Sequence, residues 1–304
     1  MPAISQLGED GLIRLVTKHL PQREDVVAGV GDDCAVIMPA SRGWLQLLKT
    51  DCIVERVHFL REHPAEQVGW KAMARVVSDI ASMAGEPQHA LVTLILPDDT
   101  QVDWVERLYV GLERCAGLFG IGIVGGETAR GTEIVISVSM VGRVKATRCT
   151  RRDGAREGDA ILVTGRLGGS LAGHHLTFIP RVTEATWLAD NARLHAMMDL
   201  SDGLARDLPR MAAASRLEFI LDEKALPLGE GCTPDQAWSD GEDYELLFAV
   251  PSRVVRQLLG AWSRRFPATP LSQIGIFVAP GEGVKPTLAG AGWDHFPGAT
   301  SATS

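Results

Sequence analysis

Cysteine is scarce in this sequence, and its spacing forms no recognisable site. Five cysteines are scattered over 304 residues, and none belongs to a Cys-x-x-Cys motif. This distribution argues against a disulfide framework and against a zinc site, and it fits thiols kept reduced. We therefore expect a cytoplasmic protein.

Long apolar runs and basic stretches are also missing. No apolar segment approaches the ~20 residues that span a bilayer, and the first residues lack the basic and apolar regions of a signal peptide. The net charge of −8 has no basic stripe to offset it, which argues against a nucleic-acid surface. We expect neither a membrane nor a nucleic acid as partner. An acidic protein that binds phosphates usually needs metal ions to bridge the like charges.

Two glycine-containing stretches look like phosphate-binding loops but lack the required context. Residues 43–50 (GWLQLLKT) nearly match the P-loop pattern, yet Leu48 occupies the position of the second glycine. Residues 120–125 (GIGIVG) match G-x-G-x-x-G, but no helical periodicity follows them, as a dinucleotide fingerprint requires. HExxH, GxSxG and kinase-type motifs do not occur. We therefore reject a P-loop and a Rossmann-type site.

The composition is that of an ordinary globular protein, with 45% hydrophobic and 22% charged residues. Pairs of strand-like runs lie between helical patterns, which favours an α+β fold over strict βαβ alternation. The polar segment 145–159 separates two strong strand signals and is the best boundary, so we expect two domains, 1–145 and 146–304. The pattern predicts strands at 45–48, 90–96, 134–142, 160–165, 217–221, 245–250 and 274–278, and helices at 66–84, 102–118, 201–215 and 252–266.

Acidic residues stand at the ends of apolar segments and beside glycines. Residues 28–37 (AGVGDDCAVI) place two aspartates inside a strand-like run, a poor place for carboxylates without partners. An oxygen-only ligand set favours Mg²⁺, Mn²⁺ or Ca²⁺, and Mg²⁺ often completes its shell with substrate phosphates. Asp33, with Asp32 as a second candidate, is therefore predicted to hold metal against a polyphosphate. The whole series comprises Asp32, Asp33, Asp51, Asp79, Glu127, Asp199, Asp202, Glu242 and Asp243.

Taken singly, these residues also have structural explanations. Asp79 falls near the end of its predicted helix, where the macrodipole disfavours a negative charge, and Arg75 one turn earlier offers it an ion pair. Ser201 is suited to cap the following helix, with Asp202 in the first turn. Capping does not explain Asp199, which follows two methionines. Both kinds of reading stay open at this point.

Eight motifs occur here in the order found in thiamine-monophosphate kinases, and the chain resembles that family from about residue 5 to residue 296. Some of these motifs are shared with a wider superfamily that includes aminoimidazole ribonucleotide synthetase, selenophosphate synthetase and a hydrogenase maturation factor. DGEDYEL and GWDHF point to the thiamine branch. The motifs are GVGDDCAVI, KTDCIVERVHF, GWKAMARVVSDIASMAGEP, GGETARG, TRRDGAREGD, DLSDGLARDL, SDGEDYELLF and GWDHF.

The resemblance implies an aminoimidazole ribonucleotide synthetase-like fold of two α/β domains, whose N-terminal sheet domains pair in a homodimer. It implies direct, in-line phosphorylation of thiamine monophosphate to thiamine diphosphate, with ATP as co-substrate and several Mg²⁺ ions. The attacking phosphate oxygen is already anionic, so we assign no general base. Carried over by motif, the metal ligands are Asp33, Thr50, Asp51, Asp79, Glu127, Asp199 and Asp202; the ATP contacts are Tyr109, Gly126, Glu127, Arg152 and Ser201; and the substrate contacts are His58, Glu242 and Trp293.

Two positions depart from the family pattern. Lys49 stands where a small hydroxyl residue often precedes Thr-Asp, which puts one metal contact in question. Glu127 is one methylene longer than the usual aspartate, and the neighbouring glycines would allow the backbone to compensate. Neither departure removes an oxygen chemistry that the mechanism requires.

Two rival interpretations remain. One is another ATP-dependent enzyme of the superfamily, which activates an amide or carbonyl oxygen; such enzymes tend to carry a glycine-rich or cysteine-bearing N-terminal segment, which MPAISQLGEDGLI lacks. The other is a non-catalytic protein that binds ATP or a thiamine phosphate as a sensor. A sensor would be expected to lose several metal aspartates, whereas nearly all are present.

Overall fold

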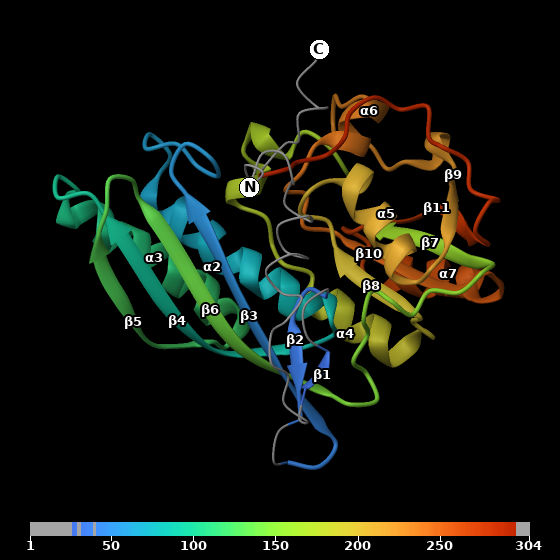
Figure 1. Cartoon of the computed structure of the whole chain (residues 1–304), viewed down its shortest axis with the longest axis horizontal. Coiled ribbons are helices and arrows are strands. Elements are labelled where there is room, and N and C mark those ends of the chain that lie inside the picture. Colours follow the sequence, from blue (N-terminus) through green and yellow to red (C-terminus); the bar gives the residue numbers. More distant parts are fainter. Residues whose placement is uncertain (1–25, 29–31, 39–40, 296–304) are drawn as a thin grey trace, which may run out of the picture.

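Two β-sheets and the helices around them make up the protein (Figure 1). The computed structural model describes residues 26–28, 32–38 and 41–295. The glycine-containing segment 29–31, which precedes Asp32, lies outside these residues. The mixture of helices and mainly antiparallel strands confirms the expected α+β class.

The first sheet has six strands in the order β1-β2-β3-β6-β4-β5. β4 and β5 are parallel and are joined through helix α3, whereas the other neighbouring pairs are antiparallel. Helices α2 and α3 pack together against one face of the sheet. The bounds are β1 Val26–Ala28, β2 Ala35–Ile37, β3 Trp44–Val54, α2 Ala65–Ser82, β4 Glu86–Leu96, α3 Val102–Phe119, β5 Gly122–Arg130 and β6 Val135–Lys145.

Helix α2 lies at the centre of this half and is buried on nearly every side. Close approach to α3 requires glycine, because a Cβ at Gly69 would lie 2.0 Å from the Leu108 carbonyl oxygen. Polar side chains on such a helix must find partners inside the protein. Lys71, Arg75 and Asp79 follow one another at four-residue intervals, so they lie along one side of α2. That side faces the candidate site.

The second sheet has five antiparallel strands in the order β8-β10-β7-β11-β9, with helices on both faces. Every residue of strand β10, which lies between β8 and β7, is buried, and successive residues pack alternately into the two cores. The bounds are β7 Asp159–Thr164, α4 Val182–Asn191, β8 Ala196–Asp199, α5 Leu204–Ala214, β9 Glu218–Leu221, α6 Pro234–Ser239, β10 Leu246–Pro251, α7 Val255–Arg265 and β11 Leu271–Val278, with short 3-10 helices at Ser170–Ala172, His174–Leu176, Glu223–Ala225 and Ser252–Val254.

The seven predicted strands and four predicted helices are confirmed, with shifts of a few residues at their ends. Sequence patterns did not reveal β5, β8, α4 or α6, because these elements are short or rich in glycine and polar residues. The rejection of a dinucleotide fingerprint at 120–125 is also confirmed, since this stretch ends α3 and opens β5 instead of following a strand. The domain division after residue 145 stays a prediction.

One local prediction is wrong. Ser201 does not cap the following helix, which begins at Leu204 with Gly203 as its N-cap. Gly203 has a φ of 96°, which favours glycine. The carboxylate of Asp207 accepts the N–H groups of Ser201 at 3.1 Å and Asp202 at 3.0 Å. A buried aspartate inside the helix therefore satisfies two backbone donors that lie just before the helix.

Candidate metal and phosphate site

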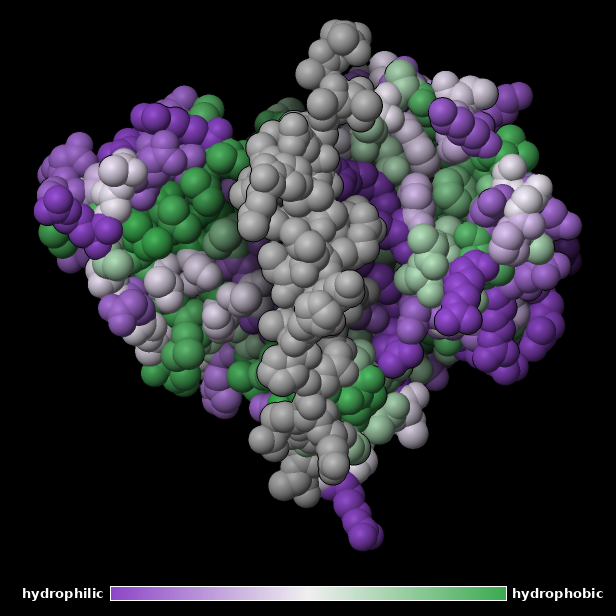
Figure 2. All heavy atoms as spheres, in the orientation of Figure 1, coloured by the Kyte–Doolittle hydropathy of each residue, from purple (hydrophilic) through white to green (hydrophobic). Residues whose placement is uncertain are grey.

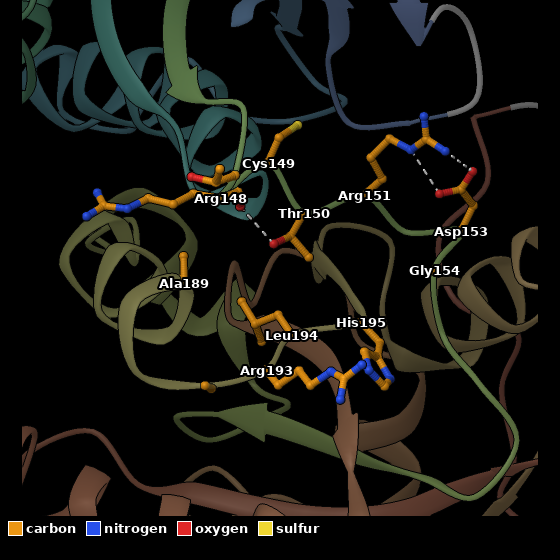
Figure 3. A pocket seen from close by; sticks show the side chains of 12 residues that line it. Arg148, Cys149, Thr150, Arg151, Asp153, Gly154, Ala189, Arg193, Leu194 and His195 are labelled. Atoms are coloured by element: carbon orange, nitrogen blue, oxygen red, sulfur yellow. Dashed lines mark hydrogen bonds and ion pairs between the residues drawn. The ribbon is translucent and has the colours of Figure 1, made fainter. Parts of the chain in front are cut away.

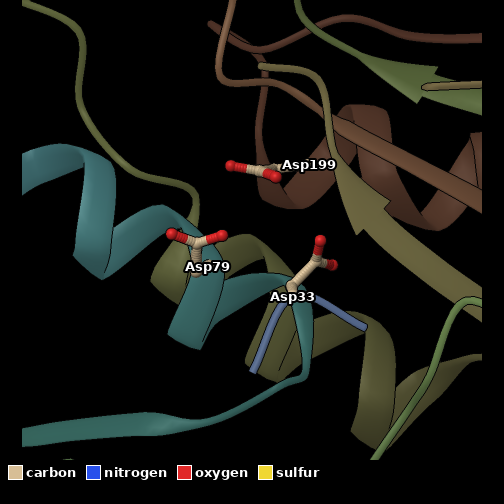
Figure 4. A group of neighbouring side chains, drawn as sticks. All are labelled: Asp33, Asp79 and Asp199. Carbon is tan, nitrogen blue, oxygen red and sulfur yellow. The ribbon is translucent and has the colours of Figure 1, made fainter. Parts of the chain in front are cut away.

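Three buried aspartates from distant parts of the chain converge (Figure 4). Asp33 lies just before β2, Asp79 in the last turn of α2, and Asp199 at the end of β8. One ligand oxygen of each residue lies within 4.8 Å of the others, and all three residues are more than nine-tenths buried. Like charges this close repel strongly in a medium of low dielectric constant. The arrangement therefore needs bound cations or protons.

Burial and this repulsion raise the pKa values of two of these carboxylates. Burial, reinforced by the charge of Asp33, raises the pKa of Asp199 to about 7. Burial also raises the pKa of Asp79 well above its ordinary value. Two serines of α2 orient the group: Ser78 Oγ donates to Asp199 Oδ2 at 2.5 Å, and Ser82 Oγ donates to Asp33 Oδ2 at 2.8 Å. The donor set consists of fixed carboxylate oxygens, which suits a hard divalent cation.

Basic side chains surround this group without balancing its charge. Lys49 Nζ lies 2.8 Å from Asp79 Oδ1, and Arg152 forms an ion pair with Asp33. Arg75, the suggested structural partner of Asp79, instead donates from Nε to Asp51 Oδ2 at 2.9 Å, so that pairing is wrong. The carboxylates of the site are Asp32, Asp33, Asp51, Asp79 and Asp199, and the three cationic groups facing them are Lys49, Arg75 and Arg152.

A second buried polar group adjoins the first through α2. The side chain of Lys71 is fully buried, and its Nζ donates to Glu242 Oε2 at 2.7 Å and to the His58 carbonyl at 2.6 Å. The His58 ring lies 5.2 Å from the His295 ring, which in turn lies 5.9 Å from the Trp293 ring. Trp293 is 45% exposed, so the surface of its ring remains open to a ligand. His58, Glu242 and Trp293 thus lie in one neighbourhood.

Two other predicted metal ligands, Thr50 and Glu127, lie away from the three aspartates of the same chain. Side chains alternate along β3: Lys49 and Asp51 contact α2, whereas Thr50 points to the opposite face and pairs with Ser139 at 2.9 Å. Glu127 lies on the edge strand β5, where its carboxylate accepts its neighbour's N–H at 2.9 Å. The strand register puts its side chain on the same outer face as Thr50.

The remaining predicted residues have identifiable surroundings. Gly126 packs against β4 so closely that a Cβ would lie 1.8 Å from the Val92 carbonyl oxygen, which is a structural reason for glycine there. Tyr109 of α3 is half-buried against the N-terminal core. The Asp202 carboxylate accepts from Arg210 Nη1 at 2.5 Å, and the Ser201 carbonyl accepts the Glu242 N–H at 2.7 Å.

Sequence reasoning overlooked several polar residues of this region. Lys71 and Arg75 precede Asp79 at four-residue intervals on a helix that carries an apolar stripe, and this spacing was the available signal for them. Tyr244 and His295 fell inside quoted motifs but were assigned no role. Ser78 and Ser82 carried no signal, because a serine in a helix usually needs no partner.

A separate cavity holds none of the predicted site residues (Figure 3). It lies between the segment 147–154 and the segment 189–195. Two of its arginines are already paired, Arg148 with Asp190 at 2.5 Å and Arg151 with Asp153 at 2.8 Å. We assign it no role.

Comparison with known proteins places the fold and site in context. Residues 31–144 match the family model of the AIR synthase related protein N-terminal domain, and residues 179–285 match that of the C-terminal domain. A thiamine-monophosphate kinase of Aquifex aeolicus is 35% identical over 96% of this chain and 99% of its own length. The chain belongs to the thiamine-monophosphate kinase family. A thiamine-monophosphate kinase of Rhodopirellula baltica is 40% identical over 77% of this chain and 78% of its own length.

Solved structures agree with membership of the thiamine-monophosphate kinase family. A structure of AaThiL complexed with AMPPCP and TMP has a TM-score of 0.82 and 33% identity, covering 97% of this chain and 99% of that chain. Escherichia coli HypE, a hydrogenase maturation protein, has a TM-score of 0.67 at 20% identity over 80% of this chain and 85% of its own, which shows the shared fold alone. Among the described residues, no helix has the length and apolarity needed to cross a bilayer.

Proposed function

We propose that this chain transfers the γ-phosphoryl group of ATP to thiamine monophosphate and so forms thiamine diphosphate. The observation that carries the proposal is the convergence of Asp33, Asp79 and Asp199, three of the aspartates expected from the family motifs. Relatives named thiamine-monophosphate kinase match nearly the whole chain, and one relative was solved with AMPPCP, an ATP analogue, and TMP.

We also propose that Asp33, Asp79 and Asp199 hold Mg²⁺, with Asp51 close by. Five carboxylates face three cationic groups, and a divalent cation would reduce the excess negative charge. When bound, the metal would supply positive charge that neutralises phosphate oxygens. The family ligand set further includes Thr50, Glu127 and Asp202, and the ATP contacts Tyr109, Gly126, Glu127, Arg152 and Ser201 stay part of the proposal.

The chain's own residues supply positioning and charge. Arg152 and Lys49 are held by carboxylates near the three aspartates, where they can help to neutralise an incoming polyphosphate. Trp293 presents an exposed aromatic surface on which a flat cationic thiamine ring can stack. The acceptor phosphate is anionic at neutral pH, so positioning and electrostatic stabilisation meet the needs of the reaction.

A homodimer is the third part of the proposal. Hydrophobic surface is exposed on the face of the first sheet opposite α2 and α3 (Figure 2). The exposed residues Leu48, Leu91 and Val124 line one groove there. An apolar sheet face of this kind suits association with a second copy. Thr50 and Glu127 lie on the same face, so a second copy would bring these residues into an interface.

The location and the domain division complete the proposal. All five cysteines are free thiols, which fits the reducing cytoplasm. We place the division between a domain at 1–145 and a domain at 146–304, where β6 ends at Lys145 and β7 begins at Asp159. The segment between these strands contains Arg152, so the boundary lies next to the site.

Turnover with different acceptors tests the activity. Purified protein, ATP and Mg²⁺ are incubated with thiamine monophosphate, thiamine or an aminoimidazole ribonucleotide precursor, and products are followed by ³¹P NMR. We expect ADP and thiamine diphosphate with thiamine monophosphate only. ADP with the aminoimidazole precursor would favour the rival amide- or carbonyl-activating enzyme. Calorimetric binding of ATP and thiamine monophosphate without turnover would favour the sensor.

A further inference from the structure

Three buried donors around Lys71 and Glu242 have no acceptor among the described residues. They are Nε2 of His58, Nη1 of Arg75 and the hydroxyl of Tyr244, and each is shielded from solvent without a hydrogen bond. The Val54 N–H donates to Nδ1 of His58 at 3.1 Å, so the neutral ring carries its proton on Nε2. Buried donors without acceptors are rare because their desolvation is costly. Three in one region indicate a missing acceptor-rich partner.

These donors belong to one connected region. Lys71 bridges the His58 carbonyl and the Glu242 carboxylate. Arg75 Nη1 lies 3.6 Å from Glu242 Oε1, beyond hydrogen-bonding distance. The N–H of Tyr244, two residues further along, donates to the carbonyl of Leu200 at 2.8 Å, and Leu200 directly follows Asp199. Tyr244 therefore joins the second buried group to the three aspartates.

The backbone at Tyr244 has an unusual conformation, and its side chain is held by stacking. Glu242 and Tyr244 have φ values of 63° and 51°, which residues other than glycine rarely adopt. The Tyr244 ring stacks on Phe178 with centroids 4.0 Å apart and planes 12° apart. Strain of this kind persists where the surroundings impose it, and it collects at ligand-binding sites. The stacking and the strained loop fix the position of a hydroxyl that has no partner among the described residues.

Arg75 is oriented in a similar way. Its Nε donates to Asp51 Oδ2 at 2.9 Å and its Nη2 to Asp51 Oδ1 at 3.5 Å, which leaves Nη1 as the unused end of the guanidinium group. A guanidinium end and a phenol hydroxyl are both donors suited to phosphate oxygens. A carbonyl or ring nitrogen would use one donor, whereas a phosphate group offers acceptors to several.

We propose that the Tyr244 hydroxyl and Arg75 Nη1 donate hydrogen bonds to the phosphate group of thiamine monophosphate and thereby select a phosphorylated acceptor. This inference rests on the proposed function and adds two contacts to the substrate side of the site. The thiamine ring system then lies on the side of His58 and Trp293, and the phosphate reaches toward Asp199.

Tyr244→Phe is the decisive variant, because it removes the hydroxyl and keeps the ring stacked on Phe178. We expect calorimetry to show about 10- to 100-fold weaker binding of thiamine monophosphate, with binding of unphosphorylated thiamine unchanged. The KM for ATP should stay the same. Without ligands, the variant should melt about 2–5 °C higher, because a buried unsatisfied hydroxyl is gone.

Thr100→Val is the matched control. The Thr100 hydroxyl is also buried without a hydrogen bond, but it lies before α3 and outside the site. This variant should melt at the same or a higher temperature and should bind thiamine monophosphate as the wild type does. The control separates the relief of an unsatisfied hydroxyl from the loss of a phosphate contact.

The outcomes distinguish this inference from the proposed function. Equal binding of thiamine monophosphate by wild type and Tyr244→Phe would overturn the inference while leaving the activity standing. A lowered melting temperature with equal losses for thiamine and thiamine monophosphate would also overturn it, since the hydroxyl would then be structural. A wild-type protein that neither binds nor phosphorylates thiamine monophosphate would refute the proposed function itself.

Discussion

The ammonium group of Lys49 lies 2.8 Å from the carboxylate of Asp79, so β3 supplies a fixed positive charge to the three converging aspartates. Burial alone would lower the pKa of Lys49, but Asp79 and Asp51 outweigh it and leave the pKa raised. Lys49 is therefore charged at neutral pH, and it occupies a carboxylate oxygen that a metal ion could otherwise use.

Lys49→Met should make the protein more dependent on metal. Without the ammonium, Asp79 loses this ion pair, and the excess negative charge near Asp33 and Asp199 grows. We expect a lower melting temperature in EDTA and a larger rise on adding Mg²⁺ than in the wild type. Lys285→Met, which removes an exposed lysine, is the control. An unchanged Mg²⁺-induced shift would mean that Lys49 and metal do not compete.

Asp199→Asn should nearly abolish turnover while the fold is kept. The change preserves side-chain volume and the hydrogen bond to Ser78, but it removes a charged oxygen ligand. We expect kcat to fall by about 100-fold or more, and the melting temperature without metal to stay equal or to rise, because repulsion with Asp33 is relieved. Asp98→Asn, at an exposed position, is the control for a general effect of charge. Near-normal activity at moderate Mg²⁺ would assign Asp199 a structural role.

Lys71 should leave a signature in the pH dependence of stability. Burial lowers its pKa from 10.5 to about 8, although Glu242 opposes the shift. The folded protein therefore binds fewer protons than the unfolded chain between these values, so stability from this group rises with pH. Relative to Lys71→Met, the wild type should gain on the order of 2 kcal/mol between about pH 7.5 and 9.5 in urea unfolding. A difference that is constant or falls with pH would contradict the lowered pKa.

Trp293→Ala should weaken thiamine monophosphate binding more than ATP binding. Trp293 is exposed beside His295, and its backbone N–H donates to the Asp202 carbonyl at 2.8 Å, a bond that the substitution keeps. Stacking on a cationic ring contributes roughly 0.5–2 kcal/mol, so KM for thiamine monophosphate should rise by about 2- to 30-fold. Trp293→Phe should recover much of the loss. Equal increases in both KM values would argue for a role in packing.

Sequence patterns were most informative for helices and strands whose own residues determine their structure. Continuous Val, Ile and Leu runs located β4, β6, β7 and β10, and the apolar stripe of α2 located its helix. Elements such as β8, with four residues and no β-branched side chain, depend on pairing with β10 and so carry no local signal. Local patterns could not reveal them.

The sequence predicted which residue types form the site, but not which of these residues contact one another. Chemistry alone marked Asp33 as an oxygen ligand, and the family motifs added Asp79 and Asp199. The convergence of the three depends on contacts between α2 and β8. The pairing of Arg75 with Asp51 instead of Asp79 also follows from the position of β3 beside α2. Helical spacing reports neighbours within one helix and cannot weigh a competitor from another element.

The last prediction concerns Glu127, which lies far from the three aspartates of its own chain. Paired residues connect Asp51, Val138, Val92 and Gly126 across β3, β6, β4 and β5. The Gly126-Glu127 segment of β5 therefore lies three strands, or about 14 Å, from Asp51. If Glu127 contributes to the site of the second copy, each site takes Asp79 from one chain and Glu127 from the other. Glu127→Ala and Asp79→Asn should each cut turnover at least about tenfold as pure homodimers.

Mixing the two variants after dissociation and reassociation should restore activity. Half of the randomly formed dimers are mixed, and each mixed dimer has one site with both defects and one site with neither, so about a quarter of wild-type activity should return. A mixture of Asp79→Asn with Asp199→Asn is the control and should stay inactive, because both residues belong to one group within the same chain. Sedimentation should show a dimer throughout. Failure of the Glu127→Ala mixture to regain activity, with subunit exchange demonstrated, would place Glu127 in the site of its own chain or outside any site.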